Sequence, residues 1–177
     1  MPHLISGGAR SGKSRHAETL ALAHPGPVTY FATAELRGGD AEFAARVEHH
    51  RARRPPGWAL EEVGRELAAA LRRHDTADGL LLIDCLGMWL MRFFTEDGFD
   101  EAAYLAERGA LLAALAALRG EALLVSNEVG WGVVSGDRET RRFVDELGRL
   151  NQQVAAVCQR VTLVACGLPL ILKGERA

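Results

Sequence analysis

The sequence is poor in lysine, in cysteine and in long apolar runs, and each shortage disfavours a class of protein. Its three cysteines are odd in number and form no CxxC pair, which argues against a disulfide framework or a zinc site and favours a reducing compartment. No stretch approaches the ~18 consecutive apolar residues of a membrane span, and the first residues lack the basic-then-apolar pattern of a signal peptide. We therefore expect a cytoplasmic protein without a membrane segment.

Positive charge is not in excess either. The formal net charge at pH 7 is -2, and charged residues of both signs are spread along the chain. A nucleic-acid binder carries a basic patch or stripe, so this balance predicts no nucleic-acid partner and disfavours an ATPase that acts on DNA. With 177 residues, of which 48% are apolar, the chain suits a single domain over residues 1–177.

Short apolar runs alternate with helical patterns along the chain. Apolar or β-branched runs predict strands at 3–6, 27–33, 58–63, 80–84, 122–127 and 162–166. Helical patterns with start and stop signals predict helices at 14–24, 41–54, 65–74, 101–118 and 138–161. The alternating order predicts an α/β fold with a mostly parallel central sheet flanked by helices.

Residues 7–14, "GGARSGKS", match the P-loop pattern, with Gly7, Gly12, Lys13 and Ser14 at its defining positions. The segment follows a predicted strand and opens a predicted helix, which is the context that the motif requires. Its glycines let backbone N–H groups turn toward phosphate oxygens, and the helix presents its positive end to the same anion. Lysine occurs only twice among 21 basic residues, so its presence here argues against an empty turn. The stretch predicts a nucleotide-binding P-loop NTPase.

Asp84 ends the apolar run "LLLID" and is the candidate partner of the P-loop in binding Mg²⁺. P-loop enzymes hold Mg²⁺ with the hydroxyl of the P-loop Ser or Thr and with an acidic residue after an apolar strand. We therefore expect Mg²⁺ at Ser14 and Asp84. A structural alternative, in which Asp84 caps the turn after its strand, is compatible with metal binding.

Two histidines and four arginines crowd the segment 46–54. On a helix with ~100° per residue, His50 lies beside the apolar stripe of Phe43 and Val47, whereas His49 falls about 100° away. A neutral imidazole can attack phosphorus, and nearby arginines can pair bidentately with phosphates. The alternative is a solvated basic helix end, because cations favour the negative end of the helix dipole. Periodicity does not decide between the two.

Two further features each have two readings. Asn127 and Glu128 in "SNEVG" follow a predicted strand, which is where ligand sites of α/β proteins lie, although a polar turn has the same composition. Lys173 is the second lysine, and it either contacts a substrate phosphate or belongs to an exposed tail.

Taken together, these motifs resemble the bifunctional adenosylcobinamide kinase / adenosylcobinamide-phosphate guanylyltransferase family of cobalamin biosynthesis. The similarity covers nearly the whole chain. The segments that carry it are "GGARSGKSRHAE" (7–18), "YFATAE" (30–35), "RVEHHRARRPPGW" (46–58), "SNEVGWGVV" (126–134), "RRFVDELGRLNQQVA" (141–155) and "GLPLILK" (167–173). The resemblance implies a P-loop α/β domain of the RecA-like type, usually assembled as a homotrimer.

The resemblance also implies two reactions on a corrinoid substrate. Members of the family phosphorylate the hydroxyl of adenosylcobinamide with ATP or GTP. They then transfer GMP from GTP to that phosphate through a covalent GMP-histidine, which yields adenosylcobinamide-GDP and pyrophosphate. The family pattern R-[IV]-x-x-H-x-x-x-R-P falls on residues 46–55 and makes His50 the expected nucleophile, with His49 as the alternative.

The nucleotide contacts that the resemblance implies lie in the P-loop, at the end of the second predicted strand, after the histidine pair and at two further acidic positions. They are Gly7, Gly8, Ala9, Arg10, Ser11, Gly12, Lys13, Ser14, Ala32, Thr33, Ala34, Arg51, Ala52, Arg53, Arg54, Glu62 and Asp84. The alternatives are a guanylyltransferase without the kinase step and a P-loop GTPase switch. The chain lacks the NKxD stretch with which such switches read guanine.

Overall fold

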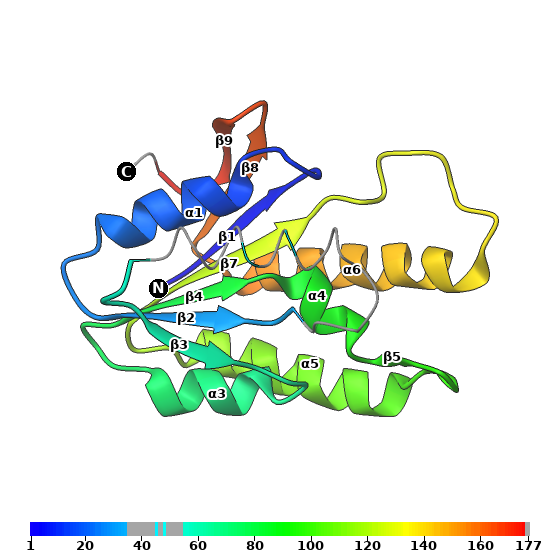
Figure 1. The fold of residues 1–177 in the computed structure, drawn as a ribbon, viewed down its shortest axis with the longest axis horizontal. Coiled ribbons are helices and arrows are strands. Elements are labelled where there is room, and N and C mark those ends of the chain that lie inside the picture. The colour runs from blue at the N-terminus through cyan, green and yellow to red at the C-terminus, as the bar shows by residue number, and fades with distance from the viewer. Residues whose placement is uncertain (35–44, 46–47, 49–54, 176–177) are drawn as a thin grey trace.

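The computed structural model describes residues 1–34, 45, 48 and 55–175, and it is built around a seven-stranded sheet (Figure 1). In order across the sheet, the strands are β3 (Ala59–Glu62), β2 (Val28–Ala32), β4 (Leu80–Asp84), β7 (Glu121–Asn127), β1 (Pro2–Gly7), β8 (Arg160–Ala165) and β9 (Leu168–Lys173). All pairs are parallel except β8 with β9. A separate hairpin pairs β5 (Phe94–Thr95) with β6 (Gly98–Phe99).

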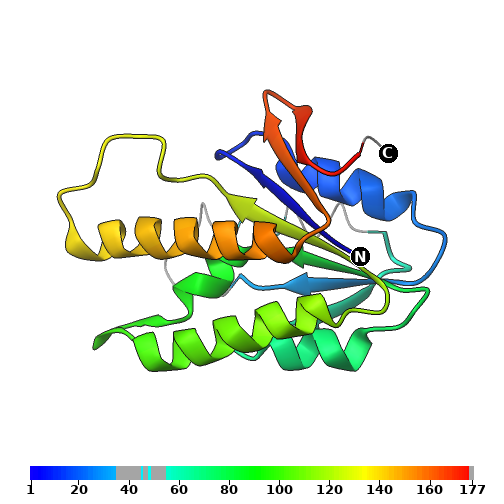
Figure 2. The same cartoon turned by 180° about the vertical axis from the view of Figure 1, so that it is seen from behind.

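Helices cover both faces of this sheet (Figures 1 and 2). One face carries α1 (Lys13–Leu22), and the other carries α3 (Leu67–His74), α5 (Glu101–Ala116) and α6 (Arg138–Val157). The short α4 (Leu86–Met91) directly follows β4 and contacts β7 and α6. In the described part of the chain, no helix is long and apolar enough to cross a membrane.

Strand side chains alternate between two cores, one on each face. On β1, Leu4 packs into the core with α3, α5 and α6, whereas Ile5 packs into the core with α1. On β4, Ile83 and Leu82 divide between the cores in the same way. Because both faces are covered, these strands read as continuous apolar runs, which explains why the sequence revealed them.

The predicted order of elements is confirmed over the described residues. The six expected strands correspond to β1, β2, β3, β4, β7 and β8, and three expected helices correspond to α1, α3 and α5. The mostly parallel α/β sheet flanked by helices is the predicted fold class. The helix expected over 41–54 lies outside the described residues, apart from positions 45 and 48.

The predictions were wrong at the C-terminal end of the chain. The helix expected to reach residue 161 ends at Val157, because Cys158 is already extended with φ -73° and ψ 142°. Strand β9 was not predicted, because Pro169 interrupts its apolar run "LPLILK", and a proline within such a run argues against a strand. Cys166 and Gly167 have φ of 53° and 78°, the two positive values with which a two-residue turn closes an antiparallel hairpin.

Lys173 has a structural role in this arrangement. Its Nζ donates hydrogen bonds to the carbonyl oxygens of Ala155 and Ala156, at 2.9 and 3.0 Å, in the last turn of α6. A cation at this position complements the negative end of the helix dipole. The geometry favours this role over the phosphate contact considered from the sequence.

The candidate site residues meet at the carboxyl edge of the sheet. Gly7 at the end of β1 pairs with Asn127 at the end of β7. Asp84 ends β4 one strand further on, and Ala32 lies between Asp84 and Glu62. Ligands of open α/β sheets bind outside this edge, so the fold brings segments from five strands to one surface.

Candidate nucleotide-binding site

The loop from Gly7 to Ser14 joins β1 to α1 in a tight curl. Gly12 stands at the start of α1 with φ 96°, no side chain caps the helix there, and Arg10 also has a positive φ of 57°. The first N–H groups of a helix have no partners within the helix, and together with the helix dipole they attract an anion. The Ser11 hydroxyl is buried and has no hydrogen-bond partner among the described residues. The loop therefore offers several donors to a phosphate.

The turn between β8 and β9 supports the P-loop from behind. The Gly167 amide donates to the Ser11 carbonyl at 2.8 Å, and a Cβ on Gly12 would lie 3.2 Å from the Gly167 Cα. A side chain on Gly12 would thus crowd the backbone of Gly167, and the left-handed φ of this position would strain any residue other than glycine. Sequence reasoning missed this contact, although "CGLP" carried a turn signal at Gly167.

Lys13 lies folded across the loop. Only 8% of the residue is exposed, and Nζ donates to the Gly8 carbonyl at 3.0 Å. Burial lowers the pKa of Lys13 below its ordinary value, because removal from water disfavours the charged ammonium. A phosphate at the loop would supply the negative charge that this buried cation needs.

Ser14 and Asp84 come together from α1 and β4. The Ser14 Oγ lies 3.5 Å from Asp84 Oδ1, and the Tyr30 hydroxyl donates to Asp84 Oδ2 at 3.2 Å. A hydroxyl and a carboxylate are the hard oxygen donors that Mg²⁺ prefers. The described residues contain no cluster of three or more His, Cys, Asp or Glu that could hold a metal. The pair therefore fits a Mg²⁺ ion that takes its other ligands from water and substrate phosphates.

Thr33 joins the end of β2 to the end of β4. Its buried hydroxyl donates to the Cys85 carbonyl at 2.8 Å and accepts from the Cys85 amide at 2.7 Å. Its own carbonyl accepts from the Arg92 Nε at 3.1 Å. Burial raises the pKa of the Cys85 thiol to about 12, so this cysteine is not a nucleophile at neutral pH. The Thr33 side chain thus holds the edge together, next to Ala32 and Ala34.

Glu62 lies at the other end of the same edge. It ends β3, which is four strands from β1 in the sheet, or roughly 19 Å at the usual strand spacing. The remaining predicted residues, which are His49, His50, Arg51, Ala52, Arg53 and Arg54, lie outside the described residues.

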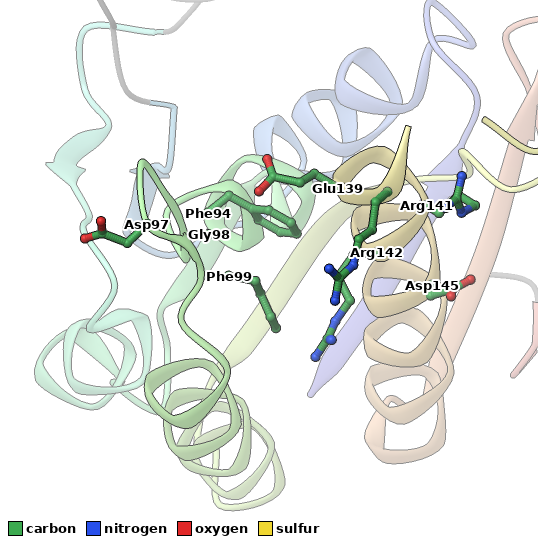
Figure 3. A pocket seen from close by; sticks show the side chains of 9 residues that line it. Phe94, Asp97, Gly98, Phe99, Glu139, Arg141, Arg142 and Asp145 are labelled. Atoms are coloured by element: carbon green, nitrogen blue, oxygen red, sulfur yellow. The ribbon is translucent and has the colours of Figure 1, made fainter. Parts of the chain in front are cut away.

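A groove of about 540 Å³ lies elsewhere, between the β5–β6 hairpin and the start of α6 (Figure 3). Its lining residues are Phe94, Asp97, Gly98, Phe99, Arg138, Glu139, Arg141, Arg142 and Asp145, none of which was a predicted site residue. The Arg142 guanidinium lies over the Phe99 ring at 4.8 Å and pairs with Glu101 at 2.9 Å. Acidic and basic residues balance in number, so the groove has no strong preference for an anion.

The fold and the loop define an α/β protein of the P-loop class. The family described as cobinamide kinase / cobinamide phosphate guanyltransferase matches residues 3–172. The chain belongs to this family and is an enzyme of that kind. The family, the fold class and the enzyme class predicted from the sequence are thereby confirmed.

Known proteins with similar sequences carry names that agree with the family. The chain is 49% identical to the bifunctional adenosylcobalamin biosynthesis protein CobP of Pseudomonas aeruginosa, over 99% of both chains. It is 37% identical to the bifunctional adenosylcobalamin biosynthesis protein CobU of Escherichia coli, over 96% of this chain and 98% of that one. A solved structure from Pyrococcus horikoshii OT3 is similar in fold alone, with a TM-score of 0.56 at 8% identity, over 99% of this chain and 87% of that one.

The two lysines provide a matched test of the loop. We expect Lys13→Met to weaken nucleotide binding about 30-fold or more, as the loss of a buried charge partner does. The melting temperature of the nucleotide-free protein should stay equal or rise, because a buried ammonium with a lowered pKa destabilises the folded state at neutral pH. That cost shrinks as the pH rises through the folded-state pKa toward the ordinary value of 10.5.

Calorimetric titration with GTP and ATP, together with thermal unfolding, measures both effects. The control is Lys173→Met, which should keep nucleotide affinity and lose some stability, because the last carbonyls of α6 lose their donor. Unchanged affinity in Lys13→Met would contradict the assignment of the loop.

Proposed function

We propose that this enzyme carries out both reactions on adenosylcobinamide. It phosphorylates the corrinoid hydroxyl with ATP or GTP, and it then transfers GMP from GTP to the new phosphate to form adenosylcobinamide-GDP and pyrophosphate. The observation that carries the proposal is the P-loop with its buried Lys13 and the adjacent Ser14–Asp84 pair, in a chain that belongs to a kinase and guanyltransferase family.

In this proposal the P-loop binds the nucleotide in both reactions. Amides of residues 8–14 and the Lys13 ammonium hold the phosphates, while Ser14 and Asp84 hold Mg²⁺. The bound ion would neutralise charge on the phosphates. Ala32 ends β2 and Thr33 and Ala34 follow it at the same edge, and Glu62 ends β3 beyond them, so we assign these positions to the nucleoside.

We further propose that GMP is carried by His50. A neutral imidazole nitrogen attacks the α-phosphorus of GTP, a P–N bond forms, and the bond to the departing pyrophosphate breaks. An oxygen of adenosylcobinamide phosphate then attacks the same phosphorus, and the P–N bond breaks. Arg51, Arg53 and Arg54 would pair with phosphate oxygens during the transfer, and Ala52 stands between them in the sequence. The support is the sequence pattern of residues 46–55.

The proposal includes a homotrimer in the cytoplasm. Its support is the apolar β9, which is the last strand of the described sheet and pairs there only with β8. Leu168, Leu170 and Leu172 on this strand are 71%, 58% and 60% exposed. An exposed apolar edge strand invites pairing with another chain, and a second copy of this protein is the partner that we propose.

The nucleophile is tested by covalent labelling with α-³²P-GTP. We expect the unaltered protein to acquire a label that acid releases and base does not, as a phosphoramidate requires. His50→Ala should lose the label and the guanylyl transfer while its kinase activity persists, and His49→Ala should keep all three. Label retained by His50→Ala and lost from His49→Ala would move the nucleophile to His49. Equal labelling of both variants would exclude either histidine.

The assembly is tested by sedimentation. The unaltered protein should sediment as three chains of 19.2 kDa each, and Leu170→Glu should shift it toward the monomer because a charge at a buried apolar contact is costly. Leu105→Glu is the control, since Leu105 is 43% exposed on α5, away from β9. A monomeric unaltered protein, or a trimer indifferent to Leu170→Glu, would contradict the interface.

A further inference from the structure

A network of polar side chains joins the end of β1, the end of β7 and α6, next to the start of the P-loop. The Ser6 hydroxyl donates to Glu128 Oε1 at 2.5 Å. The Asn151 amide donates to the same oxygen at 3.4 Å and to the Asn127 carbonyl at 3.1 Å, and its own Oδ1 accepts from Ser126 at 2.6 Å. Ser6, Ser126 and Asn151 are buried. The network therefore holds one carboxylate oxygen of Glu128 in a fixed place.

Glu128 follows the end of β7, at the level of the P-loop. Its amide donates to the Gly7 carbonyl at 3.1 Å, and Lys13 Nζ donates to the next carbonyl, that of Gly8. A P-loop lysine binds the outer phosphates of its nucleotide. The Glu128 amide is thus bound to the Gly7 carbonyl, and the Lys13 ammonium is bound to the carbonyl of the next residue. In the proposed function this ammonium contacts the phosphoryl group to be transferred.

The order of the strands places Glu128 between the two halves of the metal and phosphate site. Strand β7 lies between β1, which leads into the P-loop, and β4, which ends at Asp84. Asp84 pairs with Val125 on β7, and Gly7 pairs with Asn127. Glu128 is half-buried, and its Oε2 has no hydrogen-bond partner within the described ranges. One oxygen is held, and the other remains available to a substrate.

We propose that Glu128 is the general base of the kinase reaction, an inference that rests on the proposed function. The corrinoid hydroxyl donates to Glu128 Oε2. As its oxygen attacks the γ-phosphorus, the O–H proton passes to the carboxylate, the new O–P bond forms, and the bond to the departing nucleoside diphosphate oxygen breaks. Ser6 and Asn151 are positioning residues, because they hold Oε1 and so aim Oε2.

The guanylyl transfer does not need this base. In its first step the nucleophile is a neutral imidazole nitrogen, and in its second step it is an oxygen of a phosphate monoester. A phosphate monoester has a second pKa of about 6 and so is already largely ionised at neutral pH. A hydroxyl, in contrast, must lose its proton as it attacks. Glu128 should therefore separate the two activities of one enzyme.

The test compares both reactions in Glu128→Gln. The amide keeps the size of the side chain and an oxygen that can accept from Ser6. We expect kcat of the kinase reaction, assayed with adenosylcobinamide and ATP, to fall about 100-fold or more, as the loss of a general base does. Transfer of GMP to adenosylcobinamide phosphate should stay within about threefold of the unaltered protein, which also shows that the variant is folded. Glu121→Gln, at the other end of β7, should leave both rates unchanged.

Chemical rescue separates catalysis from a structural effect. In Glu128→Ala, added formate should restore part of the kinase rate in proportion to its concentration, because a small carboxylate can take the proton in the vacated space. Equal loss of both activities without rescue, or full kinase activity in Glu128→Gln, would overturn the role of Glu128 and leave the proposed function standing. If the unaltered protein itself made no adenosylcobinamide phosphate, the kinase half of the proposed function would fall, and the role of Glu128 with it.

Discussion

The parallel pairing of β7 with both β1 and β4 is the constraint on which this site depends. It fixes Gly7 opposite Asn127 and Asp84 opposite Val125, so the start of the P-loop and the acidic end of β4 lie on opposite sides of β7, each one strand away from it. Helix α1 then returns Ser14 to within 3.5 Å of Asp84. The closeness of Ser14 and Asp84 thus results from the order of the strands and from the turn of a single loop.

A second set of contacts keeps the loop in shape. The turn at Gly167 donates to Ser11 and packs on Gly12, while Thr33 ties the end of β2 to Cys85 after β4. Lys13 is buried against a loop carbonyl, where its charge is costly without an anion. The protein therefore carries a local loss of stability at the loop that we propose to bind phosphate, and functional sites commonly carry such a cost.

Local patterns revealed most of the fold and the loop. The glycines and Lys13 act through backbone and charge within eight residues, and the strands that are buried on both faces have apolar runs of their own. Strand β9 was missed because Pro169 interrupts its apolar run. The end of α6 was overestimated because residues up to 161 continue the helical spacing, although the chain is already extended at Cys158. The contacts of Thr33 with Cys85 and of Glu128 with Asn151 join residues that are 52 and 23 positions apart. No local sequence pattern contains such pairs, so these hydrogen bonds could be recognised only in the folded structure.

The central claim is that one P-loop serves both reactions, with GTP and the kinase nucleotide in the same place. The most direct measurement is inhibition of the two reactions by one GTP analogue that can be cleaved neither at the α- nor at the γ-phosphorus. Each reaction is assayed separately. If one P-loop binds the nucleotide in both reactions, the analogue should compete with the nucleotide in each reaction, with the same inhibition constant within error. Two clearly different constants, or inhibition of one reaction alone, would contradict the account and require a second nucleotide site.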